Sequence, residues 1–442
     1  MIRLLLADLK NNWIVWSGLL VMALVCGYLG GWGVSIEATA VHYTGLQSFG
    51  YINLFLSSVA AITILIPLSQ QLVAILSRYY ALWQLAGVRP ALVKSAILLQ
   101  LFVVAAVGAC LGTFFEMQSY ALLFPWIFSS YDLPRNIVLS LGASFMPAVW
   151  IGVGAVFVLG GYRGARAAGR ISPIEILRES ESVVTPISPM RLLICVVLAI
   201  GVALFFGSLS SPLRDGEFDQ TAFAPILIVA LFAACAPWLL SAMMQVWRGV
   251  STMRFLPSFM GARSALHQVE TAHAVEVPIM VGYGLLVGFN AMFDTLGVYA
   301  DSIGLSGLNT SLDWTGTIVL FGGPVFLSCV GASIGCLLSF GRRRQDAMLC
   351  VSLGMSKKDV LLSAVCEATL HVLSATIVGM AAACLVNALV AGAAGIMPVF
   401  GLTYVSGLIL PAFSFVLVLI AIVVPTYSGL RCHRRGELEF AD

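Results

Sequence analysis

The sequence has few charged residues for its length. Asp, Glu, Lys and Arg make up only 10% of its 442 residues, whereas 60% are hydrophobic. Because soluble domains carry about 25% charged residues, this shortage excludes a soluble enzyme and predicts a chain that lies mostly within a membrane. The formal net charge of +2 says little alone, because the positions of the charges along the chain matter more than their sum.

Lysine and histidine are also scarce, and their positions exclude several catalytic motifs. The four lysines are Lys10, Lys94, Lys357 and Lys358, and none follows a glycine, so the chain lacks the G-x-x-x-x-G-K-[ST] phosphate-binding loop. The five histidines form no H-E-x-x-H motif and no plausible hydrolase triad. We therefore expect no catalytic residue, no bound cofactor and no hydrolysis of ATP by this chain itself.

The ten cysteines indicate neither a metal site nor a disulfide framework. They lie in apolar stretches or on the side predicted to face the cytoplasm, and no pair has the spacing of metal ligands. Cysteines in such positions act as small apolar side chains that pack between helices.

Long apolar runs are what the sequence has in abundance. A membrane-spanning helix needs about 20 apolar residues, and ten stretches qualify. The fifth is the shortest, and if it formed a re-entrant pair with the sixth, the orientation of the other spans would not change. The predicted spans are 13–35, 51–76, 95–118, 138–161, 191–208, 222–246, 276–296, 315–340, 361–388 and 405–427.

The positive charges are sorted to one side of these spans. With a cytoplasmic N-terminus, the tails and loops on that side hold 21 of the 23 Lys and Arg, and the other side holds only Arg135 and Arg214. Short loops rich in Lys and Arg stay in the cytoplasm. We therefore expect an all-α, multi-pass protein of a bacterial cytoplasmic membrane with both termini cytoplasmic. Residues 1–13 predict a short interfacial helix rather than a cleavable signal peptide.

The predicted outer loops are too short to hold a folded domain. The longest are about 119–137 and 297–314. The first is rich in aromatic residues, which favours a helix lying in the outer interface. A substrate gate formed by Trp126, Phe128 and Tyr131 is the alternative.

Two cytoplasmic loops resemble each other at an offset of 267 residues. In both, a basic residue precedes a short amphipathic helix, a glycine and further basic residues follow, and a span then begins. This order predicts an internal duplication with parallel repeats: spans 1–4 in residues 1–185, connector spans 5 and 6 in 186–250, and spans 7–10 in 251–442. The offset pairs Gly87 with Gly354, Val93 with Val360, Gln100 with Glu367 and Gly112 with Gly379.

Few ionisable side chains fall within the predicted spans, and such residues are functional candidates because they are costly in lipid. Glu116 and Asp294 stand near outer span ends, close enough to the surface to reach water. Glu367 corresponds to Gln100 in the repeat, which favours a structural hydrogen bond between helices. A proton relay through Glu367 and His371, four residues apart on one helix face, is the alternative, and it would belong to an ion-driven secondary transporter.

The first copy resembles a known family. Residues 78–93 read R-Y-Y-A-L-W-Q-L-A-G-V-R-P-A-L-V, similar to a loop of the FtsX/MacB-like permease family that reads roughly R-E-x-A-L-L-R-x-L-G-A-S-x-x-x-V. After the fourth span, basic residues from Arg163 onward lead to residues 172–178, S-P-I-E-I-L-R. This segment resembles the family's ending, A-R-x-A-x-x-x-P-x-E-A-L-R.

The second copy matches the family more loosely. Residues 344–360 resemble the loop, and residues 259–270 resemble the A-x-R-x-L-x-x helix that enters the first span of that copy. Residues 430–435 keep basic side chains but lack the P-x-E-x-L-R ending. The resemblance covers nearly the whole chain except the fifth and sixth spans, and a ten-span duplicated chain is similar to permeases of the bacitracin-resistance type.

This resemblance implies the permease subunit of an ABC transporter, whose ATP and Mg²⁺ are bound by a pair of separate ATPase subunits. The loops 78–94 and 342–359 would be coupling helices seated on those ATPases, and short amphipathic helices with basic rims suit such docking. Anchoring of the basic residues to lipid headgroups is the alternative. The implied coupling residues are Arg78, Ala81, Leu82, Leu85, Gly87, Arg89, Arg344, Leu349, Gly354 and Lys357.

One departure from the family bears on the cargo. Members commonly carry a large extracytoplasmic domain after the first span of a copy, whereas 36–50 and 297–314 are bare loops here. This favours an exporter that engages its cargo within the membrane or at its outer leaflet. Such a cargo would be hydrophobic or amphipathic, for example a lipid, an antimicrobial peptide or a drug. A non-transporting transmitter that controls an extracellular hydrolase or sensor is the alternative. We expect membrane lipid as a partner and no nucleic acid.

Overall fold

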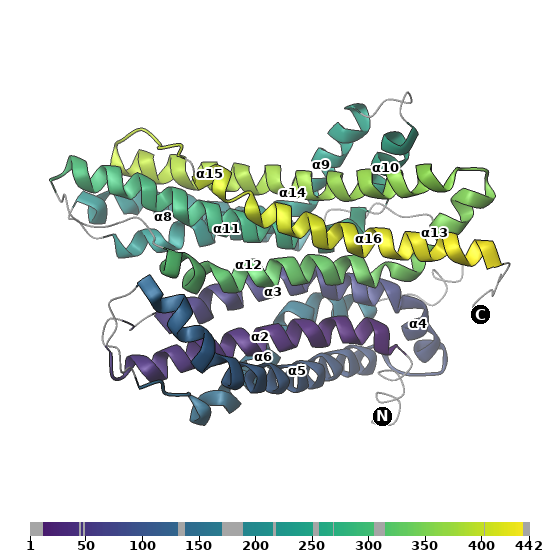
Figure 1. The fold of residues 1–442 in the computed structure, drawn as a ribbon, viewed down its shortest axis with the longest axis horizontal. Coiled ribbons are helices and arrows are strands. Elements are labelled where there is room, and N and C mark those ends of the chain that lie inside the picture. The colour runs from purple at the N-terminus through teal and green to yellow at the C-terminus, as the bar shows by residue number, and fades with distance from the viewer. Residues whose placement is uncertain are drawn as a thin grey trace. The chain divides into compact units, whose positions relative to one another are not determined.

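The computed structural model describes residues 12–43, 46, 49–130, 138–169, 189–214, 218–250, 256–267, 269–304, 314–401 and 403–435. Within these ranges the regular structure is helical throughout and contains no strand (Figure 1). Ten of the described helices are long and apolar enough to cross a membrane. They confirm the all-α, ten-span prediction. The predicted interfacial segment before residue 12 falls outside the described residues.

The ten long helices overlap the ten predicted spans, although several are longer than predicted and the fourth begins at Met146 rather than at residue 138. Each long helix begins and ends near a change from apolar to polar or glycine-containing sequence. This is expected because only apolar runs are stable in the hydrocarbon core of a bilayer. They are α2 (Trp13–Ala40), α3 (Phe49–Ile75), α5 (Pro90–Ile127), α6 (Met146–Ala168), α8 (Pro189–Arg214), α9 (Phe223–Val250), α11 (Val269–Ser302), α12 (Trp314–Leu338), α14 (Lys357–Ala394) and α16 (Ile409–Arg435).

Shorter elements connect the long helices. Two of them, α4 (Ser77–Leu85) and α13 (Phe340–Ser352), lie in the loops that the sequence analysis singled out. The others are α10 (Leu256–His267), α15 (Thr403–Ser406) and the 3₁₀ turns η2 (Phe128–Ser130), η3 (Ala143–Phe145) and η4 (Asp219–Ala222).

Two features of the spans differ from expectation. Helix α8 has 26 residues and α9 has 28, so each is long enough to cross a bilayer alone, and the fifth span is longer than predicted. Helix α5 has 38 residues and runs through the aromatic segment for which the sequence predicted a separate interfacial helix. At 1.5 Å per residue it is about 57 Å long, well beyond the roughly 30 Å of a hydrocarbon core.

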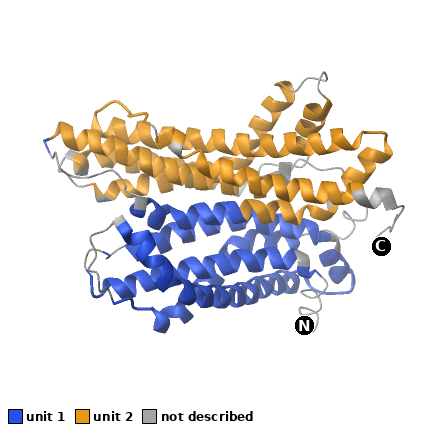
Figure 2. Ribbon diagram, in the orientation of Figure 1, with its two compact units in different colours: residues 1–188, 304–330 blue, residues 189–303, 331–442 orange. Residues whose placement is uncertain are grey.

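The chain divides into two compact units (Figure 2). The first comprises residues 1–188 and 304–330, and the second comprises 189–303 and 331–442. The division falls within α12, and the connector helices α8 and α9 belong to the second unit. The expected division into two repeats and a connector remains a prediction.

In the first unit, α2 packs along α5 at very close range, with α3 and α6 beside them. Glycines make this approach possible. A Cβ added at Gly27 would overlap the backbone of Ala109, and one added at Gly112 would overlap the backbone of Leu24. In lipid, no hydrophobic driving force brings helices together, so their association depends on close van der Waals packing. Small residues at the interface make that close packing possible.

In the second unit, α14 is the central helix. It packs against α8, α9, α10, α11 and α16. A Cβ added at Gly379 would lie 3.0 Å from the carbonyl oxygen of Met280 in α11. Gly379 thus occupies a close helix crossing, as Gly112 does at the offset position in α5.

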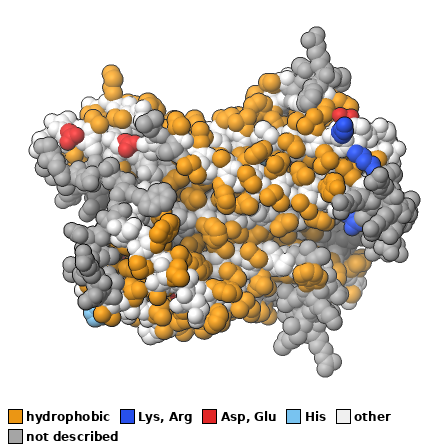
Figure 3. All heavy atoms as spheres, in the orientation of Figure 1, with side chains coloured by type: hydrophobic (Ala, Val, Ile, Leu, Met, Phe, Trp, Pro, Cys, Tyr) orange, Lys and Arg blue, Asp and Glu red, His pale blue; other side chains and the backbone are white. Residues whose placement is uncertain are grey.

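The outer surface matches a membrane location. Hydrophobic side chains cover the flanks of the helices, and the Lys and Arg side chains visible on the second unit gather at one end (Figure 3). That end carries α13 and the start of α14, where Arg344, Lys357 and Lys358 are exposed. An apolar flank with a basic end is the arrangement expected of helices that cross a bilayer.

Candidate functional site

The short helices α4 and α13 each end in a turn of the same type. Gly87 and Gly354 have φ angles of 90° and 95°, in the left-handed region where glycine carries no steric penalty. The amide of Val88 donates to the Trp83 carbonyl at 3.0 Å, and the amide of Met355 donates to the Cys350 carbonyl at 3.1 Å. These bonds define a Schellman-type cap, which fixes the direction in which the chain leaves each helix.

A long helix of the same length follows each of the two turns. Helix α5 begins at Pro90 and α14 at Lys357, and each has 38 residues. The residues before them, Arg89 and Ser356, are both extended, with ψ angles of 139° and 145°. The glycines and both ends of the long helices all differ by the same 267 residues. The 267-residue offset was suggested by a few matching residues. The two segments that it relates also share the geometry of the turn and the length of the helix that follows.

Several coupling residues predicted on these helices are exposed, although not all. Leu82 and Leu85 of α4 are 54% and 57% exposed, and Leu349 of α13 is 60% exposed. Arg89, Arg344 and Lys357 are exposed as well. Ala81, in contrast, is buried at 4% and packs within the first unit, so it is a support of α4 rather than a contact surface. The Arg78 side chain lies outside the described residues.

Each short helix is tied to its own unit by a polar side chain. In α4, Gln84 Nε2 donates to the carbonyl of Ala168 at the end of α6, at 3.1 Å. In α13, the side chain of Arg343 is buried, and its Nη1 lies 2.5 Å from Glu367 Oε1 of α14. Arg343 Nε also donates to Ser339 Oγ at 3.0 Å.

The Arg343–Glu367 pair begins a chain of buried ionisable groups in the second unit. Glu367 Oε2 accepts a hydrogen bond from Ser264 of α10 at 2.9 Å. His371 Nε2 lies 3.6 Å from Glu367 Oε1, and His371 Nδ1 lies 2.8 Å from Glu276 Oε1 of α11. Glu276 and His371 are each 1% exposed. The chain therefore joins α10, α11, α13 and α14.

Charge balance explains how this cluster is tolerated within the protein. Two carboxylates face one guanidinium and two imidazoles, because His273 Nδ1 also lies 3.9 Å from Glu276 Oε2. The guanidinium and one protonated imidazole are enough to balance the two carboxylates. Unpaired buried charges cost several kcal/mol each, whereas paired and hydrogen-bonded ones are tolerated. Burial lowers the pKa of the Arg343 guanidinium, but the adjacent Glu367 carboxylate outweighs this and holds that pKa above its ordinary value.

Sequence reasoning found two residues of this cluster. Glu367 and His371 were identified, whereas Glu276, Arg343 and Ser264 were not. Glu276 stood at the first residue of a predicted span, so extending that span to the observed start of α11 would have placed it in the protein interior. Arg343 precedes Glu367 by 24 residues across a turn, and no helical spacing connects the two.

The first unit has no ionic counterpart at the offset positions. Gln100, which corresponds to Glu367, is buried at 1%. The residue that corresponds to Arg343 is Leu76. The polar position is thus shared by both long helices, but the charged pair is confined to the second.

The other intramembrane candidates differ from each other. Asp294 is partly buried and accepts a hydrogen bond from Thr403. Glu116 is 0% exposed, so the expectation that it reaches water is wrong. It lies at the α2–α5 interface, where glycines allow the helices to approach closely.

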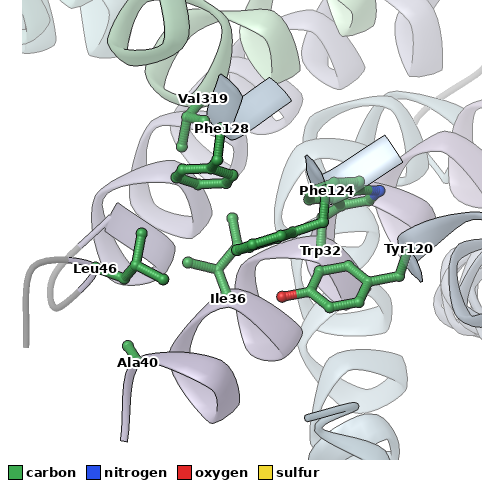
Figure 4. Packing of buried hydrophobic residues seen from close by; sticks show 8 residues of the cluster. All are labelled: Trp32, Ile36, Ala40, Leu46, Tyr120, Phe124, Phe128 and Val319. Atoms are coloured by element: carbon green, nitrogen blue, oxygen red, sulfur yellow. The ribbon is translucent and has the colours of Figure 1, made fainter. Parts of the chain in front are cut away.

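The predicted gate residues do not converge. Trp126 is 60% exposed, whereas Phe128 is 2% exposed and belongs to a buried cluster with Trp32, Tyr120 and Phe124 (Figure 4). The rings of Phe124 and Phe128 stack with centroids 4.5 Å apart. The aromatic run therefore forms part of the core of the first unit, and Tyr131 lies outside the described residues.

The second unit also contains a cavity at the end of α14 opposite to α13. Its volume is about 490 Å³, and no Lys, Arg, Asp or Glu lines it. It lies between α8, α11 and α14, with Phe206, Ser210, Tyr299, Leu389 and Gly395 among its lining residues. The cavity is only partly enclosed, and most of its lining side chains are apolar.

Within the described ranges, no cluster of His, Cys, Asp and Glu has an arrangement that could hold a metal ion. No protein-family model matches the chain, and neither a curated protein nor a solved structure matches it significantly.

Proposed function

We propose that this chain is the permease subunit of an ABC exporter in a bacterial cytoplasmic membrane. The observation that carries the proposal is the matched pair of short helices, α4 and α13, each closed by a left-handed glycine and followed by a 38-residue helix. ATP and Mg²⁺ would be bound by two separate ATPase subunits, and the two helices would be the contacts on which those subunits act.

The geometry suits the transmission of a mechanical stroke. Leu82 and Leu349 occupy offset positions and are 54% and 60% exposed, so each short helix offers an apolar contact beside basic residues. The Schellman-type cap leaves little freedom between the short helix and the long one. A push on α4 or α13 would therefore move α5 or α14 as a rigid lever.

The buried ion pair strengthens this linkage in the second unit. Arg343 belongs to α13 and Glu367 to α14, and their atoms lie 2.5 Å apart. His371 extends the connection to Glu276 of α11. Displacing α13 alone would separate buried charges, so α11 and α14 should move with it.

The cargo proposed is hydrophobic or amphipathic. The predicted outer loops leave no room for a large extracytoplasmic domain, so recognition would take place within the membrane or at its outer surface. The cavity of about 490 Å³ beside α14 supports a cargo with an apolar group.

Capture of an ATPase tests the proposal. The tagged chain is co-expressed with the ATPase genes that neighbour its own and is purified in detergent. A stoichiometric P-loop ATPase should co-purify with the wild type and be lost in Leu353→Asp. Leu353 and Met397 flank α14 and are 85% and 88% exposed, so Met397→Asp is the matched control and should retain the ATPase. Purification without any ATPase, or equal loss in both variants, would contradict the proposal.

A second candidate is an ion-driven transporter, which the Glu276–His371–Glu367 chain specifically favours. Three adjacent ionisable side chains inside a membrane helix bundle are the usual components of a proton relay. In this case, transport would continue after ATP depletion, stop when the proton gradient collapses and fail in His371→Gln. Transport that follows ATP instead would exclude this candidate.

A further inference from the structure

Within the described ranges, one buried carboxyl of the first unit has no counter-charge. Glu116 of α5 is 0% exposed, and among the described residues neither of its oxygens has a hydrogen-bond partner. The carboxyls of Glu276 and Glu367 are also buried, but His371 contacts the first and Arg343 contacts the second. Glu116 therefore differs from the two buried carboxyls of the second unit, each of which has a basic side chain in contact with it.

The interface is shaped around this carboxyl. A Cβ added to Gly31 of α2 would lie 2.9 Å from Glu116 Oε2 and 3.1 Å from its Cγ. The glycine thus provides the space that the side chain fills. The Ser35 hydroxyl, one turn further along α2, faces the carboxyl and is also buried without a hydrogen-bond partner of its own.

The other hydroxyls nearby are already engaged. Tyr120 donates to the Ser35 carbonyl at 3.0 Å, and Thr39 Oγ1 lies 3.0 Å from the Tyr120 hydroxyl. Tyr28 pairs with Ser119 at 2.8 Å. Of the hydroxyls that the structure describes around Glu116, only that of Ser35 therefore remains for it, whereas a buried ionised carboxylate is stabilised by two or three donors.

No cation on the packed helices neutralises Glu116. Besides tyrosines, the titratable groups of α2 are Cys26 and Glu37, and Glu37 accepts a hydrogen bond from the Tyr51 amide. The basic residues of α6 are Arg163 and Arg166. Trp150 of α6 lies at about the same height along the helices as Glu116, because its Nε1 donates to Thr113, which is one turn before Glu116 on α5. Arg163 is 13 residues further along α6, which is about 20 Å.

We propose that Glu116 is a proton-binding site, occupied by a proton while α2 and α5 are packed together. A bare carboxylate is unfavourable in this buried interface, and the group avoids the charge by taking up a proton. When the helices separate, water or headgroups reach the carboxyl and the proton leaves. Closure of the interface therefore binds one proton, and acid favours the closed form. This site does not depend on the proposed function.

Infrared spectroscopy of the full chain in lipid at neutral pH tests the proposal. A protonated carboxyl has a carbonyl band that is separate from the carboxylate bands and shifts in D₂O. The wild type should show this band, and Glu116→Gln should lose it while retaining the carboxylate bands. Glu37→Gln is the matched control and should keep the band, because the Glu37 side chain is partly exposed and accepts a hydrogen bond from the Tyr51 amide. Absence of the band from the wild type would overturn the proposal, even if Glu116→Gln does not fold.

A thermal unfolding series gives an independent measurement. In the unfolded chain Glu116 ionises near its ordinary value of about 4.3, so the folded protein holds an extra proton above this pH. Wild-type Tm should therefore fall relative to Glu116→Gln as pH rises from about 4 to 8. A parallel pH dependence of the two proteins would show that the carboxyl does not bind a proton on folding.

Discussion

At the scale of single residues, the second unit depends on a small number of paired charges. Arg343 and Glu367 are 8% and 5% exposed, and each neutralises the other. Such a pair adds little net stability compared with apolar residues, but loss of one partner leaves an unpaired buried charge. The asymmetry predicts a particular pattern of mutational effects.

Arg343→Met should destabilise the chain by about 3–5 kcal/mol, because it leaves Glu367 without its cation. The double variant Arg343→Met with Glu367→Leu should recover much of that loss, since both buried charges are removed. Thermal unfolding in detergent measures both effects. Lys358→Met, an exposed cation at the start of α14, is the control and should change little. Additive losses in the double variant would show that the two side chains are not coupled.

Glycine at the α2–α5 crossing gives a second residue-scale prediction. Gly112→Ala places a methyl group against the Leu24 backbone and should destabilise the first unit by about 1–3 kcal/mol. Gly152 of α6 has open space at its Cβ position, so Gly152→Ala should be neutral or stabilising by about 0.5–1 kcal/mol. The difference in Tm between the two variants measures the close packing, and equal effects would argue against it.

At the scale of elements, the left-handed glycines define the short helices. The backbone at Gly354 has a φ of 95°, with open space where a Cβ would be. A substitution there introduces backbone strain without a steric clash. Its effect on function can therefore be separated from its effect on packing.

Gly354→Ala should cost about 1–2 kcal/mol and reduce coupling between ATP hydrolysis and transport. Gly395, at the other end of α14, has a φ of 72° and is equally open, so Gly395→Ala carries similar strain away from α13 and should leave coupling intact. Gly87→Pro should insert normally but uncouple, because proline cannot adopt a φ of 90°. The readout is transport per ATP hydrolysed in proteoliposomes. Equal coupling in all three variants would count against α4 and α13 as coupling helices.

Some elements could be predicted from the sequence, and others could not. Apolar run length predicted the ten spans, and the glycine-punctuated loops predicted α4 and α13 because both signals are local. The end of α5 could not be predicted, because Tyr120 and Phe124 look equally suited to an interface and to a core. Only their packing against α2, across 80 or more residues of sequence, decides between the two. The Arg343–Glu367 pair was missed for a similar reason.

At the scale of the whole molecule, the proposed orientation depends on the sorting of basic residues. Leu353 and Met397 flank α14 and are both highly exposed, so they report on its two ends. Leu353→Cys should react with an impermeant thiol reagent only from the cytoplasmic side, and Met397→Cys only from outside, each in intact cells and inverted vesicles. The unsubstituted chain is the control for its native thiols. The reverse pattern would invert the proposed topology.

The central claim is that α4 and α13 are the surfaces on which separate ATPases act. The most direct measurement places a photo-reactive amino acid at Leu82, Leu349 or Met397 of the full chain in membranes that contain the co-expressed ATPase. The account predicts that a P-loop ATPase is cross-linked from positions 82 and 349 and not from position 397. A chain that transports its cargo while neither position 82 nor position 349 gives an ATPase adduct would contradict it.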